Sequence, residues 1–185
     1  MNSSQDPLAE TTLESQRVYE GAFLKVNKDV IALPNGKQSY REYVCHPGAV
    51  AVIAICNDGS LVFERQWRHP LHRAFFEIPA GKIDNGEDPL LAAQRELREE
   101  TGYVAKKWQH IGTLHTSIAY TNEFIEIYLA TGLTLHERKL DEGEFLELHH
   151  FSVEKLNVMV SEGKITDAKT LAALHLAQSF LRLCV

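Results

Sequence analysis

Three glutamates, Glu96, Glu99 and Glu100, crowd into one short stretch of the chain. Residues 89–101 have the three-and-four spacing of an amphipathic helix, which gathers these carboxylates beside an apolar line. Like charges at this spacing destabilise a helix and raise the pKa of each carboxyl unless a cation neutralises them. All-oxygen ligands favour a hard ion, Mg²⁺ or Mn²⁺ rather than zinc, and such an ion binds phosphate oxygens and helps to ionise water. The cluster therefore predicts metal-dependent hydrolysis of a diphosphate bond.

The ends of this helix are marked in the sequence. Asp88 is a good N-cap, Pro89 suits the first helical position, and Gly102 suits the left-handed residue just past the end. A solvated surface helix, in which Arg95 pairs with Glu99 four residues on, is the ordinary explanation of an isolated Glu-x-x-Glu-Glu pattern. The residues around the helix bear on the choice between a metal site and a solvated surface.

A longer pattern surrounds the glutamates. Gly81 is followed after five residues by Glu87, and after seven more by the run 95–103, which reads Arg-Glu-Leu-Arg-Glu-Glu-Thr-Gly-Tyr. This spacing resembles the Nudix box, without a gap or a missing position. The resemblance implies a Nudix hydrolase with an α/β fold, an α/β/α sandwich around a mixed sheet, in which the box forms a loop, a helix and a second loop.

The resemblance also assigns roles within the box. Carried over position by position, it gives four metal ligands, the carbonyl of Ala80 and the carboxylates of Glu96, Glu99 and Glu100. Glu99 is a catalytic candidate as well. Arg95 would orient the carboxylates, and Glu87 would assist structurally or electrostatically.

Two stretches outside the box, 64–68 and 76–84, resemble the ADP-ribose pyrophosphatases of this family. On that basis Arg68 and Glu77 are candidate substrate contacts, and an arginine can fork onto a phosphate. A lone arginine is otherwise an ordinary surface residue. The resemblance implies that ADP-ribose, or a related nucleoside diphosphate sugar, is cut to AMP and ribose 5-phosphate or their equivalents.

The acidic loop 141–144 is similar in position and composition to a loop of that subgroup that supplies a base and a metal ligand. Glu142 is therefore the base candidate and Glu144 a ligand candidate. An ordinary acidic turn explains the loop equally well. Glu123 resembles a substrate-contacting glutamate, although it also suits a surface position at the end of a strand.

The stretch 117–123 departs from the subgroup, which commonly carries Ser-Pro-Gly there, because it contains no proline. Other Nudix substrates, such as GDP-mannose or a dinucleotide, therefore stay open. A non-catalytic, nucleotide-sensing Nudix domain is the alternative from another functional class. The intact glutamates argue against it, since a pure binder has no need of crowded carboxylates.

Changes in pattern along the chain predict three segments. Residues 1–15 are polar and without periodicity, which is typical of a mobile tail. Residues 16–47 have strand character and an Asn35-Gly36 turn signal, so they predict a small antiparallel β unit. Residues 48–185 would form the Nudix domain. Strands are expected over 17–26, 29–33, 39–45, 49–56, 61–67, 74–78, 108–115, 123–130 and 145–151, and two closing helices after Ser152 and Asp167.

The N-terminal unit resembles the region that related enzymes exchange across a homodimer, where aromatic and arginine side chains hold the base of a nucleotide. A homodimer is therefore expected, with Phe23 and Arg41 as base contacts. A core aromatic residue and a solvated strand arginine are the alternatives for these two positions.

Composition limits the classes of partner. The 185 residues carry a formal net charge of −6, which disfavours nucleic acid polymers and anionic membranes as partners. Cys45, Cys56 and Cys184 have no CxxC spacing and are expected to be reduced. The start of the chain lacks a basic and then apolar leader pattern, and no apolar run is long enough to cross a bilayer, so we expect a cytoplasmic protein.

Overall fold

The computed structural model describes residues 6–140 and 142–181, so Asp141 and Cys184 lie outside it. The chain forms two compact units. The first contains the residues up to His46 together with His115–Glu123, and the second contains Pro47–Leu114 and the residues from Phe124 onward. None of the helices in the described ranges is long and apolar enough to cross a membrane.

A three-stranded antiparallel sheet makes up most of the first unit. It is formed in the order β1-β2-β3 by β1 (Thr11–Glu20), β2 (Lys25–Ala32) and β3 (Gln38–Cys45). The turn at Gly36, with φ 79°, joins β2 to β3 as the sequence predicts. Residues 11–15 are strand rather than tail, and the expected strand 17–26 is interrupted by a turn at 21–24. The polar start of β1 pairs with β2 through its backbone, which needs no apolar side chains.

The segment His115–Glu123 joins this unit through hydrogen bonds to the end of β3. The Val44 N–H donates to the Tyr120 carbonyl at 2.9 Å, and the His46 N–H donates to the Asn122 side-chain oxygen at 2.7 Å. The sequence-based boundaries assign this segment to the second unit, because pairing between distant residues has no local signature.

The second unit contains two sheets. One is mixed and has the order β7-β4-β9-β8, from β7 (Ala80–Lys82), β4 (Ala49–Ala54), β9 (Phe124–Leu135) and β8 (Tyr103–His115). Within it β4 runs parallel to β9 and antiparallel to β7. The other sheet is antiparallel, in the order β10-β5-β6, from β10 (Leu146–Phe151), β5 (Leu61–Arg68) and β6 (Arg73–Glu77). A short 3-10 helix, η2 (His69–Leu71), joins β5 to β6. The short strand β7 was not predicted.

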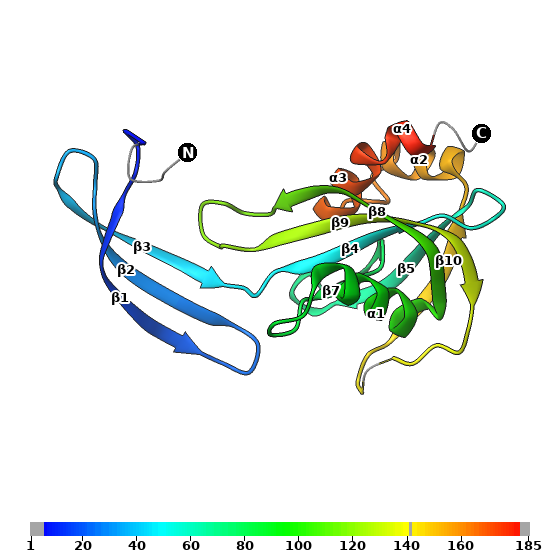
Figure 1. The fold of residues 1–185 in the computed structure, drawn as a ribbon, viewed down its shortest axis with the longest axis horizontal. Helices are drawn as coiled ribbons and strands as arrows, with labels where there is room; N and C mark the ends of the chain where they lie inside the picture. The colour runs from blue at the N-terminus through cyan, green and yellow to red at the C-terminus, as the bar shows by residue number, and fades with distance from the viewer. Residues whose placement is uncertain (1–5, 141, 182–185) are drawn as a thin grey trace. The chain divides into compact units, whose positions relative to one another are not determined.

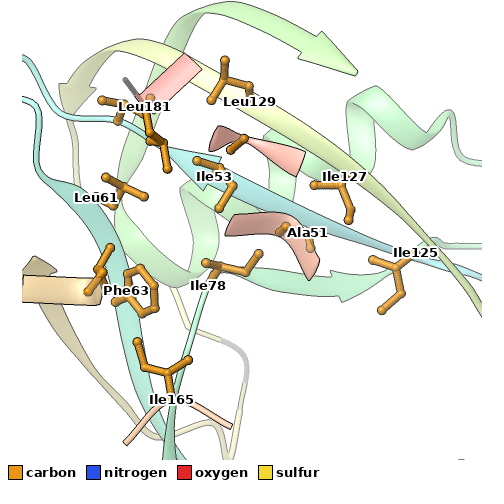
Figure 2. Close-up of a cluster of buried hydrophobic side chains, with 14 of the residues drawn as sticks. Ala51, Ile53, Leu61, Phe63, Ile78, Ile125, Ile127, Leu129, Ile165 and Leu181 are labelled. Atoms are coloured by element: carbon orange, nitrogen blue, oxygen red, sulfur yellow. The ribbon is translucent and has the colours of Figure 1, made fainter. Parts of the chain in front are cut away.

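Helices cover both faces of the mixed sheet, with α1 (Pro89–Thr101) on one side and α2 (Val153–Ser161), α3 (Ala168–Leu176) and α4 (Gln178–Leu181) on the other (Figure 1). Alternate side chains of β4 explain this arrangement. Ala51 and Ile53 belong to the cluster that includes the α2–α4 residues (Figure 2), whereas Val50 and Val52 pack with α1. A strand buried on both faces is the continuous apolar run that the sequence displays. The predicted α/β/α sandwich with a mixed sheet is confirmed.

The boundaries of α1 are those predicted. The Asp88 carboxylate accepts hydrogen bonds from the N–H groups of Leu90 at 2.9 Å and Leu91 at 3.3 Å. At the other end Gly102, with φ 77°, donates its N–H to the Arg98 carbonyl at 2.8 Å. Ser152 and Asp167 cap α2 and α3 in the same way. Capped at both ends, α1 is a rigid platform for its side chains.

Candidate active site

Helix α1 turns two of its glutamates inward. Ala93 and Leu97 are fully buried against the mixed sheet, which fixes the rotation of the helix. In that orientation Glu100 is only 5% exposed. Its Oε2 accepts a hydrogen bond from the Ala80 N–H at 3.1 Å, so the carboxylate lies directly beside the β7 backbone. The structure thus brings together Ala80 and Glu100, two of the predicted metal ligands.

Glu96 approaches the same strand at Gly81. A Cβ atom built onto Gly81 would lie 2.0–2.4 Å from the carboxylate atoms of Glu96. No side chain fits in that space, so the glycine is required by the close approach of the carboxylate rather than by its backbone angles. The short strand β7 is consequently the second wall of the site, facing α1.

Arg95 holds three carboxylates of the box together. Its guanidinium donates two hydrogen bonds of 2.9 Å to Glu87, one of 2.8 Å to Glu96 and one of 3.3 Å to Glu99. A further hydrogen bond of 3.1 Å reaches the carbonyl of Lys82 at the end of β7. One planar donor group thus ties the helix to the loop before it, and the orienting role of Arg95 stays a prediction.

A buried glutamate that the sequence interpretation did not select, Glu64, lies on the neighbouring strand β5. It is 3% exposed, and its Oε1 has no hydrogen-bond partner within the described residues. Glu144, from the loop before β10, is half-buried and accepts a hydrogen bond from the Gln66 side chain at 3.3 Å. Residues 61–63 before it are buried on both faces of β5, so alternation along the strand does not distinguish Glu64 from an exposed charged residue.

The charges of these carboxylates are strongly coupled. Burial, together with repulsion from the carboxylates of Glu144 and Glu77, raises the pKa of Glu64 to about 8. Burial, followed by repulsion from Glu64 and Glu96, raises the pKa of Glu100 well above its ordinary value. Burial also raises the pKa of Glu96, although Arg95 opposes the shift. For the carboxylates of Glu64, Glu96 and Glu100, burial and mutual repulsion therefore outweigh the effect of the nearby cations.

This donor set fits a hard divalent cation. All the candidate ligands are oxygens, and the Glu64 Oε1 atom without a partner is the kind of buried acceptor that a cation or its bound water satisfies. Within residues 6–140 and 142–181, no three acidic, histidine or cysteine side chains already surround one point. Protein donors hold the carboxylates instead, Arg95 at Glu96 and the Ala80 N–H at Glu100. Binding an ion would require these side chains to turn.

The two predicted substrate contacts on β5 and β6 bind each other. The Arg68 guanidinium forms two parallel hydrogen bonds of 2.7 Å to the Glu77 carboxylate. Lys169 of α3 contacts the same carboxylate and also bonds Asp167 at 3.0 Å. Burial acts to raise the pKa of Glu77, but the hydrogen bonds and charges of Arg68 and Lys169 outweigh it and lower the pKa. Lys169 has no sequence signal, because its helix reaches β6 only in the folded chain.

The remaining predicted residues belong to the loop before β10 and to the first unit. Glu142 is exposed in the loop before β10. The first unit contains Phe23, which is 64% exposed, and Arg41, which pairs with Glu10 and lines a hollow of about 470 Å³. It also contains Glu123, which accepts a hydrogen bond of 2.7 Å from Thr116. Within the second unit, the box residues occur together with Glu64, Arg68, Glu77 and Glu144.

Two family matches together span most of the chain. The NUDIX domain family matches residues 46–174. The family described as the nucleoside diphosphate sugar hydrolase N-terminal domain matches residues 10–44. The division between the two matches falls at the end of β3, close to the division between the compact units.

Individual relatives resemble the chain over nearly their whole lengths. An ADP-ribose pyrophosphatase of Bacillus subtilis (strain 168) is 41% identical over 173 residues, covering 92% of this chain and 94% of the relative. A methanol dehydrogenase activator of Bacillus methanolicus is 41% identical over 171 residues, covering 91% and 92%. The crystal structure of an ADP compounds hydrolase has the same fold, with a TM-score of 0.83 at 24% identity and 94% coverage of both chains. With the box geometry in place and the family matched over most of its length, the chain belongs to the Nudix hydrolases.

Proposed function

We propose that this enzyme hydrolyses the diphosphate bond of ADP-ribose, or of a related nucleoside diphosphate sugar, with Mg²⁺ as its cofactor and Mn²⁺ as a substitute. The observation that carries the proposal is the crowding of the Glu64, Glu96 and Glu100 carboxylates beside the Ala80–Gly81 backbone. The substrate class is supported by the Bacillus subtilis relative, which is named an ADP-ribose pyrophosphatase, and by the N-terminal family match.

The metal would be held by the Ala80 carbonyl and the carboxylates of Glu96, Glu99, Glu100 and Glu144. Bound there, Mg²⁺ supplies positive charge for the diphosphate oxygens and lowers the pKa of water. Arg95 keeps the carboxylates that it contacts in place while Glu142, on its exposed loop, takes a proton from the attacking water. Water oxygen bonds to one phosphorus as the bond from that phosphorus to the bridging oxygen breaks. The products with ADP-ribose are AMP and ribose 5-phosphate.

Arg68 is the proposed phosphate contact outside the box. Its side chain is 43% exposed, whereas that of Glu77 is only 5% exposed. We therefore propose that Glu77 holds Arg68 in position and does not itself contact the substrate. The bidentate pair fixes the plane of the guanidinium and leaves its remaining N–H groups for an anion.

A substrate panel tests the reaction and its specificity. The purified enzyme is incubated with Mg²⁺ and ADP-ribose, another ADP-sugar, GDP-mannose or a dinucleotide, and the products are separated by chromatography. We expect the highest kcat/KM with an ADP-sugar. If none of these compounds is cleaved, the proposed reaction is wrong, and a higher kcat/KM with GDP-mannose or the dinucleotide would replace the proposed substrate.

Paired variants test the metal site. Glu96→Gln and Glu100→Gln should abolish turnover while the far-ultraviolet circular dichroism spectrum stays that of the wild type. Glu154→Gln is the matched control, because Glu154 is an exposed glutamate on α2, far from the box in sequence. Turnover by the Glu100→Gln variant at the wild-type rate would refute its role as a ligand.

We also propose that the enzyme is a homodimer formed through the first unit, with Phe23, Arg41 and Glu123 contributing to substrate binding there. The exposure of the first unit supports the proposed dimer. Every residue of β1 is exposed, and so are the large apolar side chains of Tyr19, Phe23 and Tyr40. Such side chains on a small sheet indicate a surface that a partner covers. Light scattering coupled to size exclusion tests this, and a monomer at micromolar concentration would contradict it.

A further inference from the structure

A large cavity on the second unit borders the carboxylate site, because Arg95 and Glu99 are among the residues that line it. It has a volume of about 940 Å³ and opens over the outer face of α1, between that helix, the start of β8 and the loop that follows β9. The volume falls within the range of small-molecule sites, about 300–1,000 Å³. Its α1 wall includes Leu91 and Arg98, which are exposed, whereas the inner carboxylate of Glu100 faces β7 on the buried side of the same helix.

Positive charge dominates the lining of this cavity. Five basic and two acidic side chains line it, in a chain whose formal net charge is −6. Arg95 is already paired with the glutamates of the box. The four other cations come from three elements, and none of them has a side-chain hydrogen bond or ion pair within the described part of the chain; they are Arg98, Lys106, Arg138 and Lys139. Cations gathered in this way repel one another unless an anion lies between them.

The wall of the cavity also has an apolar part. Trp108 is half-buried, its indole N–H donates to the Ala105 carbonyl at 3.3 Å, and its ring lies 6.4 Å from that of Tyr128. Its polar edge is therefore satisfied and its orientation fixed. Together with Leu91 and Val104 it offers a surface against which a flat organic group can pack.

We propose that this cavity is a second ligand site, which binds a small organic polyphosphate, with the phosphates among the four cations and the organic group against Trp108. A compact ligand suits the site better than a nucleic acid polymer, since the negative charge of the whole chain opposes a long polyanion. The proposal concerns binding and does not depend on the catalytic reaction. The cavity is connected to the box helix, because the Lys139 N–H donates a hydrogen bond to the Glu99 carbonyl at 3.1 Å.

Calorimetry with two probes, inorganic tripolyphosphate and ATP, tests the site in the presence of a chelator. The protein carries Glu96→Gln and Glu100→Gln, so that neither metal-dependent binding at the box nor turnover contributes. In this background Lys106→Ala with Arg138→Ala should weaken both probes about tenfold or more, because each lost cation removes a charge-assisted contact. Lys37→Ala with Lys155→Ala removes the same charge from exposed positions outside the cavity and should leave both affinities unchanged.

Three results would overturn the proposal. These are the absence of binding by either probe, equal binding by the cavity variant and its parent, and equal losses in the cavity and control variants. Tighter binding of ATP than of tripolyphosphate, lost on Trp108→Ala, is the result expected if the apolar wall holds the organic group. Unfolding temperatures of all variants, measured without ligand, separate loss of binding from loss of the fold. The double variant Lys106→Ala with Arg138→Ala is also assayed in the otherwise wild-type enzyme. Unchanged hydrolytic activity would show that the cavity cations are not needed for catalysis.

Discussion

Replacing Glu64 by glutamine should make the metal-free enzyme more stable at alkaline pH, although it removes a native side chain. The carboxyl of Glu64 has an ordinary pKa of 4.5 when the chain is unfolded and a pKa of about 8 in the folded protein, because it is buried beside other carboxylates. Between those two values the folded state binds a proton that the unfolded state has lost. Stability from this group is therefore complete below pH 4.5 and is lost as the pH rises toward 8.

The size of the effect follows from the same two values. Each unit of pKa difference corresponds to about 1.4 kcal/mol, so ionising Glu64 costs the folded state roughly 5 kcal/mol at most. Glutamine keeps the shape of the side chain and never ionises. For a chain of this length 1 kcal/mol moves the unfolding temperature by about 2–4 °C. The Glu64→Gln variant should therefore lose distinctly less stability than the wild type between pH 5 and pH 8.5.

Thermal unfolding followed by circular dichroism, across this pH range and with a chelator present, measures the difference. Glu162→Gln is the control, because its exposed carboxylate is already ionised above pH 5 and should leave the slope unchanged. Added Mg²⁺ should stabilise the wild type more than the Glu64→Gln variant. Parallel pH profiles for the wild type and Glu64→Gln without metal would refute the electrostatic reasoning.

Other substitutions probe the supports of the site. Gly81→Ala places a methyl group where the Glu96 carboxylate lies, so Mg²⁺ should bind more weakly with little change in unfolding temperature; an unchanged Mg²⁺ affinity by calorimetry would contradict this. Asp88→Ala removes the N-cap of α1 and should lower the free energy of unfolding by about 1 kcal/mol in a urea titration. Arg95→Lys keeps the charge but loses the forked hydrogen bonds, so kcat should fall more than the unfolding temperature, and equal kcat values would show that charge alone suffices. Lys169→Met leaves Arg68 as the remaining basic partner of the Glu77 carboxylate and should raise KM more than it lowers kcat, which steady-state kinetics would detect.

The catalytic helix could be predicted to the residue because its signals are local. A capping side chain, a proline and a glycine each act within one turn, so neighbouring residues determine where α1 begins and ends. The spacing of the box residues also predicted the loop that precedes this helix. In contrast, β7 has only three residues, and its pairing with β4 arises from the tertiary fold rather than from any pattern of its own.

Residues brought in from other elements were harder to predict. Glu64 reads as one more charged residue in a strand until the buried face of β5 is known, and Lys169 meets Glu77 only because α3 packs at the end of β6. The early start of β1 was hidden by its polar composition, since an exposed strand has no apolar alternation. What the sequence could not supply was the set of long-range contacts that determine which polar side chains lie inside.

The burial of Glu64, which raises the pKa of its carboxyl to about 8, has a consequence for calorimetry. An ion that enters a cluster in which Glu64 is protonated near neutral pH has to displace that proton into the buffer. The measured heat of Mg²⁺ binding should then change with the ionisation enthalpy of the buffer, and phosphate and Tris should give different apparent enthalpies at one pH. The slope of the measured heat against buffer ionisation enthalpy gives the number of protons released when Mg²⁺ binds. This number should be lower for the Glu64→Gln variant, because glutamine has no ionisable proton to release.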